Sequence, residues 1–416
     1  MTGKTILQSK TKSSALGYAI SFLLLISLIC SGVLFIASAN KRLEMNYVLK
    51  EHLLFDNLFS LNYGARQRNA GSHTLFHPAG DTSEVSVRAW GAYKIVTANT
   101  WHGERQVKKA ALIGYPLLEQ LPALYLVDNS QSLKVCGTTR IEGEAFVPER
   151  GIERSYIGGK HYQNDQLMYG VQKKSEIFLP ALNPVYQNLD FSSFSKEGTK
   201  SVFIAKDSVY PFDKETVIMS QIEPLTLRNK LYGNIILHSF DSILVSAEAK
   251  LENVILIAPV IRIEKGFKGS VQAVAHKKIV CEKGVKLLYP STLVLNEQEM
   301  NLGTEDRCIV LEEGSSIIGG ILMTSQVADY RKPVRLSVAE NAVIGGLVFN
   351  QGETALYGTI IGSIYTRNFR IDAGGGVYTN NLLDAVISSV QIPKEFLYPD
   401  WLKEMKLKPA KIITCF

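Results

Sequence analysis

Most of the short motifs that would assign a chemistry are missing from this sequence. Its 416 residues contain no GxSxG, P-loop or GxGxxG motif. The formal charge of +6 comes from 45 basic and 39 acidic residues that are spread along the chain without a basic stripe. We therefore predict no nucleic-acid partner, and we expect no cofactor, no metal site and no catalytic residue.

Cysteine is scarce, and its spacing excludes two further classes of protein. The chain has five widely spaced cysteines: Cys30, Cys136, Cys281, Cys308 and Cys415. Their number is odd and no CxxC pair occurs, which argues against a disulfide framework and against a structural zinc site. We expect these thiols to be small, buried apolar side chains.

Charge is absent from one long stretch near the N-terminus. Residues 15–39, ALGYAISFLLLISLICSGVLFIASA, contain no charged side chain. At about 1.5 Å per residue, a helix of this length crosses a hydrocarbon core of about 30 Å. The sequence therefore predicts a transmembrane helix after a tail of residues 1–14. No second such run follows, so we expect a single pass.

The flanks of this helix distinguish an anchor from a cleaved signal peptide. Residues 37–39, ASA, resemble a signal-peptidase site, but the apolar run exceeds the roughly 7–15 residues of a secretory signal. We therefore predict an uncleaved signal anchor that contacts membrane lipid through residues 15–39. The short tail and the large following body favour a cytoplasmic tail, with the body outside the cytoplasmic (inner) membrane.

The helical pattern continues beyond the apolar run. Residues 40–63 contain no glycine or proline, and Gly64 is the first helix breaker. Five apolar residues fall on one helical face at spacings of four, seven, four and three: Leu43, Tyr47, Leu54, Leu58 and Leu61. The pattern predicts a membrane-proximal amphipathic helix that packs on the outer body.

Later segments carry β patterns of differing regularity. Residues 64–160 contain period-two runs such as EVSVRAWGAYKIVTA, which indicate a β-rich region. Residues 161–232 lack that regularity, and we interpret them as an irregular insertion or packing arm. Residues 391–416 contain Phe396, Tyr398 and Trp401 and predict a C-terminal cap or tail.

A repeat of 18 residues occupies the region 233–390. Three units begin at Ile243, Ile261 and Ile279, and two further units begin at Ile309 and Leu336. Glycine or asparagine usually follows as a turn residue, as both tolerate positive φ. Polar insertions from Asn296 and Thr324 account for the longer later intervals. The pattern predicts a mainly β fold with a β-solenoid of five or six coils, stacked at about 4.8 Å. An ordinary β-sandwich is the alternative.

Two pairs of residues are candidate sites. His73 and His77 lie four apart, but the pair lacks the HExxH pattern and a proline follows it, so we interpret both as surface loop histidines. Glu264 and Glu282 occupy equivalent points on neighbouring coils, about 5 Å apart at the expected stacking distance. A carboxylate pair of this kind serves acid–base chemistry in polysaccharide-active β-helix enzymes. A lysine follows each glutamate, which favours a solvated charged edge instead.

Two partial resemblances follow from these patterns. The units from Ile243 to Val348 resemble the short coils of bactofilins, which implies a cytoskeletal scaffold that polymerises. Residues 10–66 resemble the larger minor pilins and pseudopilins, which combine a basic leader, an apolar helix and a β-rich body. That resemblance implies a cut between Gly17 and Tyr18, after which the fifth residue is Phe22 in place of the usual glutamate. The architecture also resembles uncharacterised single-pass bacterial membrane proteins with a β-helical outer part.

These observations favour a structural role in the bacterial cell envelope. We predict a membrane-anchored scaffold that presents a β-solenoid outside the cytoplasmic membrane. The alternative is a minor-pilin-like or pseudopilin-like assembly component, and a third hypothesis is a polysaccharide-active β-helix enzyme. We expect protein partners in the envelope and leave self-association open.

Overall fold

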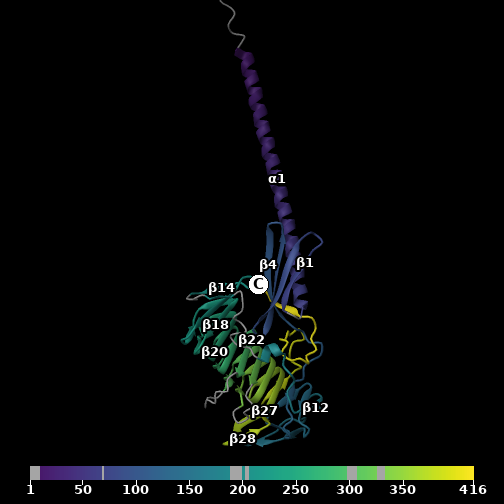
Figure 1. Cartoon of the computed structure of the whole chain (residues 1–416), viewed down its shortest axis with the longest axis vertical. Coiled ribbons are helices and arrows are strands. Elements are labelled where there is room, and N and C mark those ends of the chain that lie inside the picture. The colour runs from purple at the N-terminus through teal and green to yellow at the C-terminus, as the bar shows by residue number, and fades with distance from the viewer. Residues whose placement is uncertain (1–9, 68–69, 188–198, 202–205, 298–306, 326–332) are drawn as a thin grey trace, which may run out of the picture.

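The computed structural model describes residues 10–67, 70–187, 199–201, 206–297, 307–325 and 333–416. Within them the protein is mainly β, with one long helix at the N-terminus (Figure 1). That helix, α1 (Lys10–Arg66), is continuous over 57 residues and contains no proline. It joins the predicted membrane helix to the predicted membrane-proximal helix, and its N-terminal part projects beyond the β body.

An antiparallel sheet lies beside the C-terminal part of α1. Its strand order is β1-β2-β3-β4-β31. The bounds of these strands are β1 (Gly71–Phe76), β2 (Thr82–Trp90), β3 (Tyr93–His102), β4 (Arg105–Gly114) and β31 (Lys411–Cys415). Tight turns at Gly91 (φ 60°) and Gly103 (φ 58°) connect the middle strands. The C-terminal strand β31 therefore completes a sheet that begins near the helix.

Most other strands belong to one closed, largely parallel arrangement or to the three-stranded parallel sheet β29-β6-β9, and we call the two together the parallel stack. In its first part the strands are β5 (Leu124–Leu126), β6 (Leu133–Cys136), β7 (Arg140–Glu142), β8 (Ala145–Val147), β9 (Ile152–Arg154), β12 (Gln172–Lys174), β13 (Thr199–Ser201), β14 (Ser208–Tyr210), β15 (Thr216–Gln221), β16 (Leu225–Leu227), β17 (Lys230–Gly233), β18 (Ile235–Ser239) and β19 (Ser242–Val245). The later strands are β20 (Lys250–Ile263), β21 (Lys268–Cys281), β22 (Lys286–Glu297), β23 (Cys308–Leu311), β24 (Ser316–Ser325), β25 (Arg335–Val338), β26 (Val343–Leu356), β27 (Thr359–Ala373), β28 (Gly376–Thr379), β29 (Asn381–Leu383) and β30 (Val386–Ser388). The short elements β10 (Tyr156–Ile157), β11 (Lys160–His161) and α2 (Pro184–Gln187) lie outside it.

The register of the parallel stack follows the sequence repeat. Ile243 pairs with Ile261, and Ile261 pairs with Ile279 in parallel strands. The same column continues through Ile309 to Leu336. Each repeat unit therefore lies on the next, and the apolar residues of the repeat form a continuous buried core inside the stack.

The turns of the repeat have the predicted backbone conformation. Gly266, Gly284 and Asn341 have φ values of 81°, 69° and 58°. This left-handed region favours glycine and asparagine, which explains their place after each aliphatic strand. Of the two predicted polar insertions, residues 298–306 and 326–332 lie outside the described residues.

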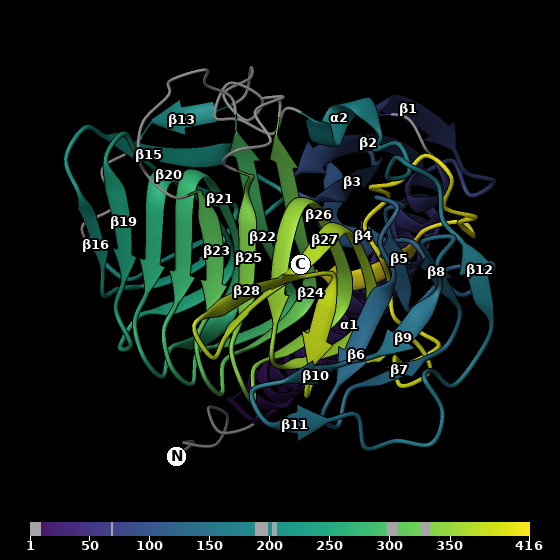
Figure 2. The same ribbon diagram turned by 90° about the horizontal axis from the view of Figure 1, so that it is seen from below.

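The early strands of the chain join the stack at its C-terminal end. Strand β27 pairs with β5 through Ile364 and Leu124, β30 pairs with β7, and β29 pairs with β6. Strands β13 to β17 lie at the opposite end (Figure 2). Strands on both sides of the predicted boundaries at 160 and 232 therefore belong to the parallel stack. Because these parallel pairs join segments far apart in sequence, the 18-residue interval did not predict the pairing of β5, β6 and β7 with the C-terminal strands.

The C-terminal tail covers one side of the stack and does not cap its end. Tyr398 pairs with Tyr115, Leu402 pairs with Leu182, and the final strand β31 pairs with β4. Strands β20, β21 and β22 carry buried side chains on their outward face as well, including Ile257, Val274 and Val294. A second apolar core lies between this face, the antiparallel sheet and the tail, and it includes the fully buried Trp401. An apolar outward face requires such a cover.

A buried glutamine fixes the antiparallel sheet to the parallel stack. The side chain of Gln272 on β21 accepts a hydrogen bond from the Ala92 amide at 2.7 Å and donates one to the Trp90 carbonyl at 3.1 Å. These two backbone groups belong to the turn between β2 and β3. The sheet that holds α1 is therefore tied to the stack by directional bonds as well as by apolar contact.

Candidate functional site: the seat of the anchor helix

The N-terminal part of α1 presents an apolar surface that the β body does not cover. Its large apolar side chains between Leu16 and Ile36 are exposed. Among the described residues, this is the one helix long and apolar enough to cross a membrane. Its length, composition and place in the chain are those of a signal anchor or a signal sequence.

The C-terminal part of α1 is seated on the antiparallel sheet. The buried helix residues are Leu53, Asn57, Ser60, Leu61, Gly64 and Ala65. The sequence predicted a different face, and only Leu61 of that set is buried, because Leu43, Tyr47 and Leu58 are exposed and Leu54 is partly exposed. Most of the true contact face is polar or small, so its hydropathy gives no amphipathic signal.

A glycine allows the closest approach between helix and sheet. A Cβ atom at Gly64 would lie 2.5 Å from the Cγ1 atoms of both Val85 and Val96. That distance is shorter than any normal carbon–carbon contact. Gly64, predicted as the helix breaker, lies inside the helix, which ends at Arg66, and its lack of a side chain lets the two elements pack.

The amide of Asn57 provides the central polar contact of the seat. Its Nδ2 donates hydrogen bonds to the carbonyl oxygens of Ala98 (2.9 Å) and Val107 (3.0 Å), and it contacts Thr100 Oγ1 at 3.1 Å. Asn57 is fully buried. Because a buried amide without partners is strongly unfavourable, this contact fixes both the position and the rotation of α1 on β3 and β4.

A cluster of ionisable groups surrounds the same contact. His77 Nε2 lies 3.2 Å from Ser60 Oγ and 2.7 Å from Ser83 Oγ, and His77 Nδ1 lies 3.5 Å from Asp56. Burial raises the pKa of Asp56, and the hydrogen bond that its protonated carboxyl donates to Asp81 raises it further, while His77 acts in the opposite direction.

The structure corrects the prediction for the two histidines. His73 lies in strand β1, and His77 is 9% exposed and belongs to the helix seat instead of a surface loop. Their sequence spacing gave no sign of this role, because its partners come from α1 and β2. Within the described ranges, no three His, Cys, Asp or Glu side chains are arranged to hold a metal ion.

The candidate carboxylates of the repeat bond to backbone amides. Glu264 accepts a hydrogen bond from the Ala247 amide at 3.2 Å, and Glu282 accepts one from the Lys265 amide at 3.0 Å. Glu312 repeats the arrangement one coil further on. The hydrogen bond from Arg262 lowers the pKa of Glu282. Each glutamate therefore stabilises the turn of the preceding coil by accepting a backbone hydrogen bond.

The cysteines differ in their exposure. Cys136, Cys281 and Cys308 are buried, as predicted, and burial raises the pKa of Cys281 to about 12. Cys30 on α1 and Cys415 on β31 are exposed free thiols, which corrects the prediction for these two. An α1 surface that projects beyond the body and a terminal edge strand leave both side chains uncovered.

Comparison with known proteins gives a distant likeness among solved structures. No protein-family model matches the chain, and no curated protein matches it. Among solved structures, the competence-associated pilin ComZ from Thermus thermophilus is similar over 90% of this chain and 95% of that chain, at 11% identity and a TM-score of 0.22. A TM-score this low carries no argument about the fold or the role of this chain.

Proposed function

We propose that the protein is a pilin-like assembly component of the bacterial envelope, anchored by α1 in the cytoplasmic membrane. The observation that carries the proposal is the geometry of α1. Its apolar N-terminal part stands free of the body, while its C-terminal part is fixed to an antiparallel sheet by Gly64 and Asn57. A helix fixed at one end holds its free part in a defined direction relative to the body.

The outer face of the seated part supports assembly through helices. Tyr47, Phe55 and Phe59 are 72%, 71% and 56% exposed. They continue the exposed apolar surface of the membrane part toward the body. We infer that a helix of a second copy, or of a related subunit, covers this surface.

In this proposal the parallel stack is a β-solenoid displayed outside the membrane. Its role is structural, because Glu264 and Glu282 serve the turns of the coils and each is engaged by a backbone amide. A scaffold without pilin-like processing is the second candidate, favoured by the continuous register of the repeat from Ile243 to Leu336.

Disulfide cross-linking in isolated membranes tests the helix contact. A full-length protein with Cys30→Ser and Cys415→Ser removes both exposed thiols, and single cysteines are then placed at positions 27, 28, 29 and 30 to sample a full helical turn. We expect mild oxidation to give a disulfide-linked dimer that is strongest at one or two adjacent positions. Monomer at all four positions, as in the cysteine-depleted control, contradicts helix-mediated assembly.

A further inference from the structure

One apolar column of the parallel stack emerges from under its cover. Paired residues on the outward face run from Val294 through Leu322 to Phe349, and the column continues through Tyr365, Tyr125 and Phe146. The Tyr125 ring stacks on Tyr365 at 5.6 Å and on Phe146 at 5.4 Å between centroids. The tail covers the earlier part of this column, and the last three rings line a cavity.

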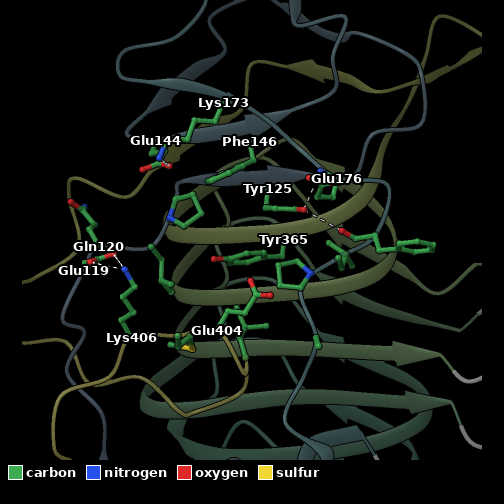
Figure 3. A pocket seen from close by; sticks show the side chains of 18 of the residues that line it. Glu119, Gln120, Tyr125, Glu144, Phe146, Lys173, Glu176, Tyr365, Glu404 and Lys406 are labelled. Atoms are coloured by element: carbon green, nitrogen blue, oxygen red, sulfur yellow. Dashed lines mark hydrogen bonds and ion pairs between the residues drawn. The ribbon is translucent and has the colours of Figure 1, made fainter.

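The cavity lies between three chain segments (Figure 3). Residues 119–122 form one wall, residues 176–181 form the opposite wall, and residues 402–406 of the tail lie across the front. Its volume is about 670 Å³, which is within the range of small-molecule sites. The walls include prolines and leucines, so an apolar stem fits beside the aromatic floor.

The hydroxyl of a largely buried tyrosine points into this cavity. Tyr365 is 4% exposed, and no described residue forms a hydrogen bond with its hydroxyl, which Figure 3 shows directed into the cavity. The neighbouring Tyr125 hydroxyl, in contrast, donates to the Phe178 carbonyl and accepts from the Glu176 amide, each at 3.2 Å. A hydroxyl that faces a cavity can donate a hydrogen bond to a ligand atom or accept one from it, so the Tyr365 hydroxyl is suited to a polar ligand atom.

The charges around the cavity favour a cation. Lys406 pairs with Glu119 at 2.8 Å, and Lys173 pairs with Glu144 at 2.5 Å, so these lysines are already neutralised. Glu404 and Glu176 form no ion pair with any described residue, and both act electrostatically on the Tyr125 hydroxyl. Glu404 also acts on Tyr365. The third lysine of the lining, Lys174, pairs with Glu149 at 3.0 Å and also interacts with Glu176. The lining thus holds four glutamates against three lysines, and the Glu404 carboxylate has no paired cation among the described residues.

We propose that this cavity binds a linear oligoamine, with an apolar methylene stem on the aromatic column and ammonium groups at Glu404, Glu176 and the Tyr365 hydroxyl. An ammonium group donates hydrogen bonds, which the two carboxylates and the hydroxyl oxygen accept. The site does not suit a sugar, because both faces of the Tyr125 ring are occupied by neighbouring rings. It does not suit an anion, since each of its three lysines is paired with a glutamate. This proposal is independent of the assembly role of α1.

Calorimetric titration of the full chain in neutral detergent with spermidine tests the proposal. We expect saturable binding at one site, weakened by salt, and no binding of hexane-1,6-diol, which has a similar stem without charge. Glu404→Gln should weaken spermidine binding about tenfold, as expected for the loss of a charge-assisted bond. Tyr365→Phe keeps the ring stack and should weaken binding by a smaller factor.

Two controls keep the result decisive. Glu153→Gln on β9 changes an exposed glutamate outside the cavity and should leave spermidine affinity unchanged. Near-ultraviolet circular dichroism reports whether the aromatic column is intact in each variant. Absence of saturable binding to the wild-type protein, or equal affinity in Glu404→Gln and Glu153→Gln, overturns the proposal.

Discussion

In the parallel stack each buried aliphatic residue meets its equivalent in the next coil, whereas the helix seat buries Asn57, Ser60 and Gly64 between two different elements. The stack has many similar contacts, so each contributes a modest share of one continuous core. The seat has few contacts, and each depends on a single atom. The Nδ2 donor of Asn57 must be present, and a Cβ atom at Gly64 must be absent. The stack is therefore a repetitive support, and the seat is a specific joint that sets the direction of the anchor helix.

Truncation inside the stack should give the largest change in stability. Ile279→Ala removes a fully buried side chain that pairs with Ile261 and Ile309, and we expect a loss of about 4 kcal/mol in the free energy of unfolding. Chemical denaturation followed by circular dichroism measures this. The outward neighbour Val280→Ala is the control, and an equal loss there would contradict the assignment of inward and outward positions.

Filling the closest contact of the seat should separate helix from sheet. Gly64→Leu introduces atoms where Val85 and Val96 already lie, and we expect a destabilisation of about 3 kcal/mol. Faster proteolytic cleavage between α1 and β1 measures the release. Gly32→Leu is a matched control in the same helix, because no atom lies within 4 Å of a Cβ atom placed there. Unchanged cleavage in Gly64→Leu would show that the seat is not closely packed.

Removal of the central amide should loosen the seat without a steric clash. Asn57→Ala leaves the carbonyl groups of Ala98 and Val107 without their donor, and we expect a loss of about 2 kcal/mol. Faster hydrogen exchange of the β3 and β4 backbone amides in Asn57→Ala measures this loss of stability. Asn62→Ala is the control, since the exposed Asn62 amide donates to the Leu58 carbonyl of its own helix. Comparable exchange in both variants would argue against a fixed helix rotation.

The smallest effect is expected from pH. Because the pKa of Asp56 is raised in the folded protein, its contribution to stability is present below the unfolded pKa and is lost as pH rises through the folded pKa. The groups that face it are His77, Asp81 and His52. Relative to Asp56→Asn, the wild-type protein should gain stability as pH is lowered from 7 toward 4. A constant difference between the two melting temperatures over this range would refute the raised pKa.

The two regions also differ in how far the sequence predicts them. The 18-residue period and the turn residues Gly266 and Gly284 repeat locally, so the alignment of coils was predictable. Residues 254–258 are consecutive apolar residues, and such a run indicates a strand that is buried on both faces. The 18-residue period alone did not indicate this second buried face.

The helix seat and the end of the stack were not predictable in the same way. The seat face consists partly of asparagine, serine and glycine, which hydropathy does not mark. The pairing of β5 with β27 and of β31 with β4 joins segments hundreds of residues apart. The proposed oligoamine site combines residues from three such segments, so it had no sequence signal.

The intact mass of the mature protein from isolated membranes tests the central claim most directly. The pilin-like account predicts the mass of residues 18–416, with the apolar part of α1 retained. The mass of the complete chain, 46.1 kDa, would favour the scaffold without processing. The mass of residues 40–416 would contradict both, because the membrane part of α1 would then be removed from the working protein.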